Sequence, residues 1–170
     1  MRTRAGVRTL ALLACVLALA VTTRALPRAS SGKELRGKVV KLHDGDSFEL
    51  LLDHRTVGVR VFGIDCPERS QPWGARAKSF TAGLIGNADV AVVVKDVDRY
   101  GRTVGDVVLA DGRHLSHELL RAGLAWYYRR YDDDPELEKL EAEARAARRG
   151  LWSDPHPVAP WNYRKARRAG

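Results

Sequence analysis

The stretch RGKVVKLHDGDSFELLLDHRTVGVRVF, residues 36–62, carries the pattern that predicts the fold of this chain. Val40 and Leu42 alternate with Lys41, and apolar and polar residues alternate again over residues 48–53, as they do in half-buried β-strands. Between these segments, Asp44-Gly45 is a strong turn signal. A third strand is predicted over residues 56–62, with valines on one face and Arg60 on the other. This part of the chain should therefore form a three-stranded meander.

The rest of the domain mixes helices with two further strands. Apolar residues at helical spacing predict a helix that starts near Trp73 and stops at Gly86-Asn87. Strands are predicted over residues 90–97 and 103–110, followed by a short helix that ends at Gly123. A last helix should begin with Asp134 as its cap and Pro135 in its first turn, and run to Gly150. Five short strands with three helices predict an α+β, mainly β fold, a five-stranded Greek-key barrel of the OB type.

The N-terminal residues have the layout of a secretory signal peptide. A basic start precedes the apolar run of residues 10–21, and small residues suit cleavage after Ala20 or Ala25. The run is shorter than the roughly 20 residues that span a bilayer, although an uncleaved anchor is the alternative. We therefore expect a leader over residues 1–25, a linker over 26–35, the domain over 36–153 and a basic C-terminal tail over 154–170. The protein should be secreted or periplasmic, monomeric, and without stable membrane association once the leader is removed.

Charge and cysteine content narrow the class of protein. The formal net charge is +8, and cleavage after Ala25 would remove four arginines and leave +4. Late basic residues, over 145–149 and 164–168, would attract polyanions, or would form only a solvated helix face and a loose tail. Cys66 is the only cysteine after the leader, so no internal disulfide can form. The sequence contains no cysteine pair of the kind that binds zinc.

Three carboxylates stand where chain segments turn or end. Asp46 follows the first hairpin turn and Asp65 ends the third strand, so the two converge if those strands are neighbours. Carboxylate oxygens suit a hard divalent cation such as calcium. Glu68 follows three residues after Asp65 and could prepare a water for attack on phosphorus. The alternatives are a plain turn, a plain strand exit and an exposed charged loop.

Two arginines suit the complementary task of holding a phosphate. Arg60 lies in a strand rich in valine and needs either a ligand or a structural ion pair, for which Glu49 or Asp53 are the candidates. Arg102 ends the loop between the fourth and fifth strands, where it could stabilise the charge of a pentacovalent transition state.

A further segment mixes aromatic and basic residues. The run WYYRRY, residues 126–131, can stack bases and hold backbone phosphates, or can be a packing hinge before the last helix. Tyr128 and Tyr131 are the substrate-binding candidates within it.

In order along the chain, these motifs resemble the staphylococcal nuclease (thermonuclease) family over residues 36–152. The match rests on DGDS (44–47), Arg60, GIDCPE (63–68), Trp73-Gly74 with Ala77, DRYGR (98–102), GLA (123–125) and GLW (150–152). Ser47 and Cys66 depart from the residues that are usual in the family, and the loop after Glu68 is shorter.

The resemblance implies an OB-fold, calcium-dependent enzyme that hydrolyses DNA and RNA with little sequence specificity. It implies calcium ligation by Asp46, Asp65 and the backbone carbonyl of Cys66. By the same resemblance Glu68 would be the general base, and Arg60 and Arg102 would grip the scissile phosphate. Tyr100 would contact a substrate phosphate, and we expect Arg99 to lie at the substrate as well. The alternative is a non-catalytic OB-fold module that binds nucleic acid, and a binding domain for another polyanion is a third reading.

Overall fold

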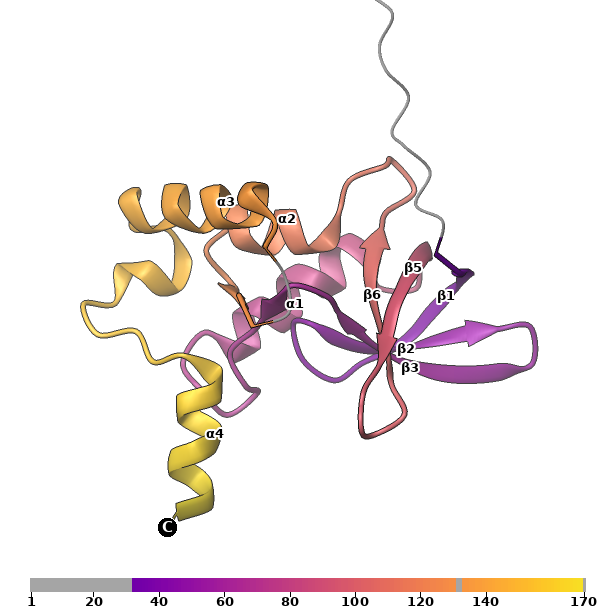
Figure 1. Cartoon of the computed structure of the whole chain (residues 1–170), viewed down its shortest axis with the longest axis horizontal. Helices are drawn as coiled ribbons and strands as arrows, with labels where there is room; N and C mark the ends of the chain where they lie inside the picture. Colours follow the sequence, from indigo (N-terminus) through magenta and orange to yellow (C-terminus); the bar gives the residue numbers. More distant parts are fainter. Residues whose placement is uncertain (1–31, 131–132, 170) are drawn as a thin grey trace, which may run out of the picture.

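A closed five-stranded barrel forms the body of the protein (Figure 1). The computed structural model describes residues 32–130 and 133–169, so the expected leader and Tyr131 lie outside the described residues. Around the barrel the strand order is β1-β2-β3-β6-β5, and all neighbours are antiparallel except β3 and β6. The barrel strands are β1 (Glu34–Leu42), β2 (Ser47–Leu52), β3 (Arg55–Val61), β5 (Asp89–Val97) and β6 (Thr103–Val108). The predicted five-stranded barrel is confirmed.

Two short strands lie outside the barrel and pair with each other. They are β4 (Ile64–Asp65), which follows β3 directly, and β7 (Trp126–Tyr127). This pairing ties the exit of β3, where Asp65 lies, to the aromatic and basic run near residue 126.

Helices gather on one side of the barrel (Figure 1). They are α1 (Gly74–Ile85), α2 (Leu115–Arg121), α3 (Pro135–Ala146), the 3-10 turn η1 (Gly150–Ser153) and α4 (Pro160–Ala169). The predicted cap of α3 is confirmed, since the Asp134 carboxylate accepts a hydrogen bond from Glu136 N at 2.8 Å. None of the described helices is long and apolar enough to cross a membrane.

The described residues contain four α-helices where the sequence predicts three. The additional helix, α4, lies in the segment expected to be a basic tail. Its sequence, PWNYRKARRA, has few apolar residues and therefore gives little sign of burial, although Arg, Lys and Ala are good helix formers and Pro160 suits the first position.

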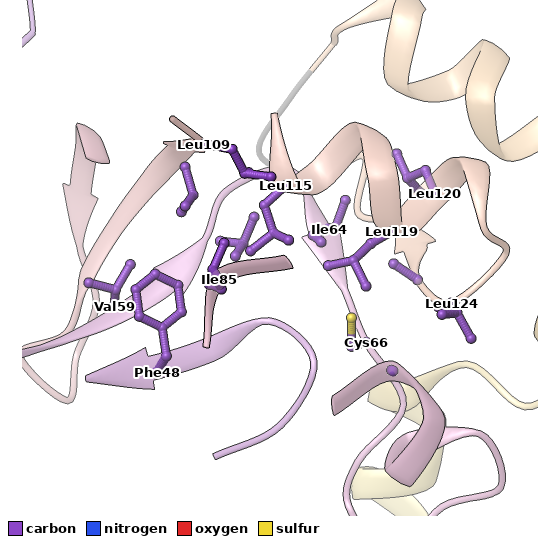
Figure 2. Close-up of a cluster of buried hydrophobic side chains, with 14 of the residues drawn as sticks. Phe48, Val59, Ile64, Cys66, Ile85, Leu109, Leu115, Leu119, Leu120 and Leu124 are labelled. Carbon is purple, nitrogen blue, oxygen red and sulfur yellow. The ribbon is translucent and has the colours of Figure 1, made fainter. Parts of the chain in front are cut away.

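The core runs from the barrel interior into the helices (Figure 2). Phe48, Leu50 and Val59 fill the barrel, while Ile85 of α1 and buried leucines of α2 close one end. On β1 the inward residue is Val39, and Val40 is exposed. A bulge between Val39 and Lys41 shifts the register there, which the alternation of Val40 with Leu42 does not reveal.

The ends of α2 and α3 meet at two glycines with positive φ. Gly123 has φ 67° and Gly150 has φ 55°, and Leu151 N donates to Gly123 O at 2.8 Å. A Cβ at Gly123 would lie 2.2 Å from the carbonyl oxygen of Arg149, so no side chain fits there. This contact fixes the end of α2 relative to the end of α3.

Candidate active site

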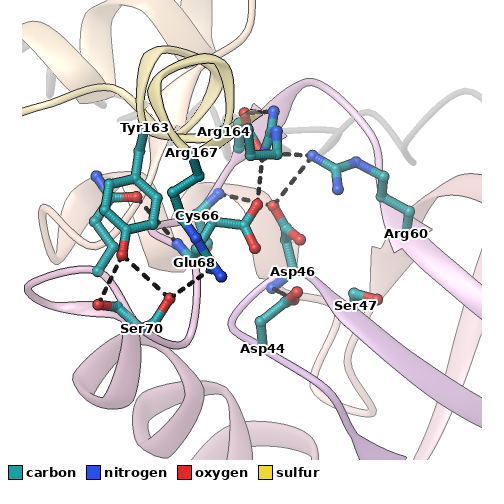
Figure 3. Close-up of polar contacts among 12 residues, drawn as sticks. Asp44, Asp46, Ser47, Arg60, Cys66, Glu68, Ser70, Tyr163, Arg164 and Arg167 are labelled. Atoms are coloured by element: carbon teal, nitrogen blue, oxygen red, sulfur yellow. Dashed lines mark hydrogen bonds and ion pairs between the residues drawn. The ribbon is translucent and has the colours of Figure 1, made fainter. Parts of the chain in front are cut away.

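Asp46 and Asp65 lie side by side, as predicted for residues on neighbouring strands. Asp46 ends the turn between β1 and β2, and its carboxylate accepts from Cys66 N, next to Asp65, at 2.7 Å. A single nitrogen of Arg60, Nη2, contacts both carboxylates, at 2.6 Å from Asp65 and 3.6 Å from Asp46. Both side chains are almost fully buried, with 1% and 2% of their surface exposed. The two acids and Arg60 therefore form one buried cluster. Figure 3 shows Asp46 and Arg60 within it.

The turn that carries Asp46 is held from two directions. Asp44 accepts from Asp46 N at 3.1 Å, which confirms that Asp44 is part of the turn. From α1, the hydroxyl of Thr81 donates to Gly45 O at 2.6 Å. A Cβ at Gly45 would lie 2.8 Å from both Ala77 Cβ and Cys66 Sγ, so the turn fits against α1 only with glycine. Helix α1 therefore sets the position of Asp46.

Arg60 pairs with neither Glu49 nor Asp53, the partners that the structural alternative named. In the β2–β3 register Arg60 lies opposite Ser47, whereas Glu49 lies opposite Gly58 and pairs with Lys41 at 3.0 Å. The ion pair that Arg60 forms is with the predicted metal-binding carboxylates themselves. Arg60 therefore forms a structural ion pair inside the candidate site.

Burial dominates the electrostatics of the cluster. It raises the pKa of Asp46 well above its ordinary value, because attraction by Arg60 offsets only part of the desolvation, and Asp44 and Asp65 raise it further. In turn, attraction by Asp46 raises the pKa of Arg60 despite its burial, with Asp65 adding to the effect. A cation at these carboxylates would therefore offset the cost of burying their negative charge.

The oxygen donors of the cluster fit a hard cation. Within residues 32–130 and 133–169, no three His, Cys, Asp or Glu side chains are grouped so as to hold a metal. Two carboxylates and the carbonyl of Cys66 would therefore need water to complete the six to eight oxygen ligands of calcium. The thiol of Cys66 is an unsuitable ligand, since burial raises its pKa and the nearby aspartates raise it further.

Glu68 lies in the loop after β4 and contacts an arginine that the sequence analysis did not single out. Arg164 of α4 donates to Glu68 Oε1 at 2.7 Å and to both oxygens of Asp65, at 2.7 and 3.2 Å (Figure 3). Burial lowers the pKa of Arg164, but these hydrogen bonds raise it more, and the net direction is upward. The sequence gives no sign of this contact beyond a basic charge, because α4 is distant along the chain and poor in apolar residues.

Arg102 lies beside the acidic cluster. Its guanidinium binds Asp98 at 2.7 and 2.8 Å and reaches the hydroxyl of Ser47, next to Asp46, at 3.4 Å. The stem of Arg102 lies over Gly58 of β3, where a Cβ would be 3.1 Å from Arg102 Cγ. Arg60, in β3, and Arg102, at the end of the loop that leads into the neighbouring strand β6, therefore approach the same region.

The other two residues predicted in this loop lie at its exposed tip. Tyr100 is 66% exposed, and Arg99 donates to its hydroxyl at 2.7 Å. The guanidinium carbon of Arg102 lies 5.6 Å from the centre of the Tyr100 ring. The tip is thus a basic and aromatic surface contiguous with Arg102.

The aromatic and basic run near residue 126 both packs and lines a cleft. Trp126 contacts Trp152 and Trp161, with ring centroids 4.4 and 5.6 Å apart. Tyr128 lines a cleft of about 530 Å³ together with Trp126, Trp161 and Arg145. Trp126 therefore acts as the packing hinge, while Tyr128 packs on Trp161, with ring centroids 5.3 Å apart, at the cleft wall.

Comparison with known proteins agrees with this arrangement. Residues 58–154 match the family described as "Staphylococcal nuclease homologue", a match that ends before α4. The chain is 42% identical over 168 residues to "Protein ParB" of Escherichia coli, covering 93% of each chain. It is 40% identical over 131 residues to an "Uncharacterized endonuclease" of Escherichia coli O157:H7, covering 77% of this chain and 86% of the relative. It is also 38% identical over 165 residues to a "Micrococcal nuclease" of Shigella flexneri, covering 91% and 94% respectively. With its barrel and its motifs in place, the chain belongs to the staphylococcal nuclease family.

Proposed function

We propose that this protein is an exported, calcium-dependent nuclease that hydrolyses phosphodiester bonds of DNA and RNA with little sequence specificity. The observation that carries the proposal is the buried cluster of Asp46, Asp65 and Arg60, with Glu68 bound to the same Arg164 as Asp65. Burying these carboxylates beside Arg60 and Arg164 is costly. The cost is understandable if the carboxylates bind a cation and the site binds a phosphate. Membership of a nuclease family supports the same conclusion.

Asp46, Asp65 and the carbonyl of Cys66 would hold calcium, which supplies a Lewis acid for a phosphate oxygen. Glu68 would accept a proton from the attacking water at a carboxylate oxygen. Arg60 and Arg102 would offset the charge that develops at phosphorus, and both already lie at the cluster. Of these residues, Arg60 lies in a barrel strand, while the others lie in turns, loops or the short strand β4 next to the barrel.

Strand binding would extend outward from this cluster. Arg99 and Tyr100 at the exposed loop tip would contact backbone phosphates, and Tyr128 and Tyr131 would contact bases or sugars. Bases stack on aromatic rings regardless of their identity, which is consistent with low sequence specificity.

Cleavage assays on Glu68→Gln and Arg102→Ala test the mechanism. Each variant should lose turnover by orders of magnitude while keeping its unfolding transition. Arg113→Ala is a matched control. Arg113 forms an ion pair with Asp111, just as Arg102 forms one with Asp98, but Arg113 follows the end of β6 whereas Arg102 precedes its start. Near-normal turnover in both folded variants would reject the mechanism.

The same protein should be incubated with single-stranded DNA, duplex DNA and RNA, with calcium or with a chelator. Cleavage that requires calcium supports the proposal. Binding without calcium-dependent cleavage would show a nucleic-acid-binding module instead.

Export and cleavage of the leader are tested separately. Sequencing the N-terminus of the protein recovered from the periplasm or medium should find a start after Ala20 or Ala25. A recovered chain that retains residues 1–25 would contradict cleavage.

A further inference from the structure

Asp65 is enclosed by two guanidiniums. Arg60 donates to its Oδ1 at 2.6 Å, and Arg164 donates to Oδ2 at 2.7 Å and to Oδ1 at 3.2 Å. With 2% of its side chain exposed, Asp65 has almost no surface left for solvent. A cation cannot bind Asp65 until one of these guanidiniums moves.

The two guanidiniums differ in how firmly they are held. Arg60 projects from β3, which pairs with β2 on one side and β6 on the other. Arg164 projects from α4, the last helix, and its side chain is 32% exposed. Arg164, which is the more exposed of the two and projects from the last helix, is therefore the easier group to displace.

Aromatic packing and hydrogen bonds attach helix α4 to the domain. Trp161 packs on Trp126 and Tyr128, with centroids 5.6 and 5.3 Å apart. The hydroxyl of Tyr163 donates to Ser70 O at 3.1 Å, close to Glu68. Trp161 and Arg164 are three residues apart and so share one helix face. The stacking of Trp161 therefore sets how Arg164 is presented to the carboxylates.

We propose that Arg164 is a positioning residue of this site, whose guanidinium competes with the divalent cation for Asp65 and so couples the docking of α4 to metal binding. Without the cation, Arg164 neutralises Asp65 and Glu68 together (Figure 3). Binding of the cation displaces Arg164 from Asp65 and leaves Glu68 free to accept a proton. The inference rests on the proposed calcium site, and it concerns a helix outside the residues that match the family.

Calcium titrations of the full chain by calorimetry test this coupling. Arg164→Gln should bind calcium at least about fivefold more tightly than the unaltered protein, the lower end of ordinary coupling between sites. Arg168→Gln is the matched control. Arg168 is exposed and lies one helical turn after Arg164, so this variant removes the same charge away from the carboxylates. Its affinity should stay within about twofold, because exposed charges are screened by salt.

Trp161→Ala tests the coupling without changing any charge. It weakens the docking of α4 but leaves Arg164 in the chain, so it should also bind calcium more tightly than the unaltered protein. Thermal unfolding in a chelator checks that each variant is folded before its titration is interpreted.

Three results would overturn the proposal. The first is that Arg164→Gln binds calcium no more tightly than the unaltered protein, while Asp46→Asn still abolishes binding. This result rejects the competition but supports the calcium site. The second is an unchanged affinity in folded Trp161→Ala, which rejects the link to helix docking. The third, no calcium binding by the unaltered chain, rejects the competition and the proposed calcium site together.

Discussion

Replacing Arg60 by methionine should destabilise the protein by about 3 kcal/mol at pH 8 in the absence of divalent cations. Methionine keeps much of the length of the side chain and removes only the charge and its hydrogen bonds. The change leaves two carboxylates, Asp46 and Asp65, buried without the guanidinium that contacts both. Since neither side chain is more than 2% exposed, water cannot replace that guanidinium without local opening.

The magnitude follows from the geometry. Opposite charges about 4 Å apart attract by about 4 kcal/mol at an effective dielectric constant of about 20. Arg60 lies at 2.6 and 3.6 Å from its two partners, so attraction exceeds this value before offsets. Two effects reduce the loss: the variant no longer desolvates a guanidinium, and Arg164 remains on Asp65. The result falls near the lower end of the roughly 3–5 kcal/mol expected for removing one partner of a buried pair.

The loss should depend on pH in a defined direction. The pKa of Asp46 is already raised by burial, so the native state binds its proton more tightly than the unfolded chain does. Stability therefore falls as pH rises from the unfolded pKa, about 3.9, through the raised native pKa. Removing Arg60 raises the pKa of Asp46 further and so widens the pH range over which stability falls. The difference between variant and unaltered protein should be smaller at pH 5 than at pH 8.

Urea denaturation followed by tryptophan fluorescence, with a chelator present, measures this loss. Arg55→Met is the control, because Arg55 lies at the exposed start of the same strand, and its effect should stay within about 0.5 kcal/mol. Adding calcium should narrow the gap between Arg60→Met and the unaltered protein, since the cation would neutralise the same carboxylates. A loss below about 1 kcal/mol at pH 8, or one that grows toward pH 5, would refute the reasoning.

Three further predictions follow from the packing around the site. Gly123→Ala should cost about 2–4 kcal/mol in urea denaturation, because its φ is positive and the new Cβ would lie 2.2 Å from Arg149 O. Gly83→Ala, in α1 with nothing within 4 Å, should instead stabilise by about 0.5–1 kcal/mol, and equal effects at the two glycines would contradict this account. Thr81→Val should cost about 1–2 kcal/mol and weaken calcium binding, because Gly45 O loses its buried donor; unchanged stability and calorimetric affinity would show that this bond does not hold the turn. The thiol of Cys66 should react with iodoacetamide far more slowly in the native protein than in concentrated urea, because burial raises its pKa and excludes the reagent, and equal rates by mass spectrometry would reject that protection.

Much of the fold can be predicted from local sequence. Alternation predicted the barrel strands, and Asp134 with Pro135 predicted the start of α3, because these signals act over a few residues. The inward position of Val39 could not be predicted, since a bulge depends on how β1 pairs with β2. Helix α4 cannot be predicted for a related reason: its sequence is polar, and its docking depends on Trp161 meeting Trp126 and Tyr128.

In the candidate site, too, some features follow from the sequence and others from tertiary contacts. Its chemistry, two aspartates, a glutamate and two arginines between residues 46 and 102, was determined by the sequence alone, because the residue types and the motifs that carry them can be read directly. The tertiary structure decided which charges meet. It paired Arg60 with Asp46 and Asp65 rather than with Glu49 or Asp53, and it brought Arg164 onto Asp65 and Glu68. The physical reason is that a salt bridge needs proximity, and residues about a hundred positions apart gain it only when strands, turns and the last helix have packed.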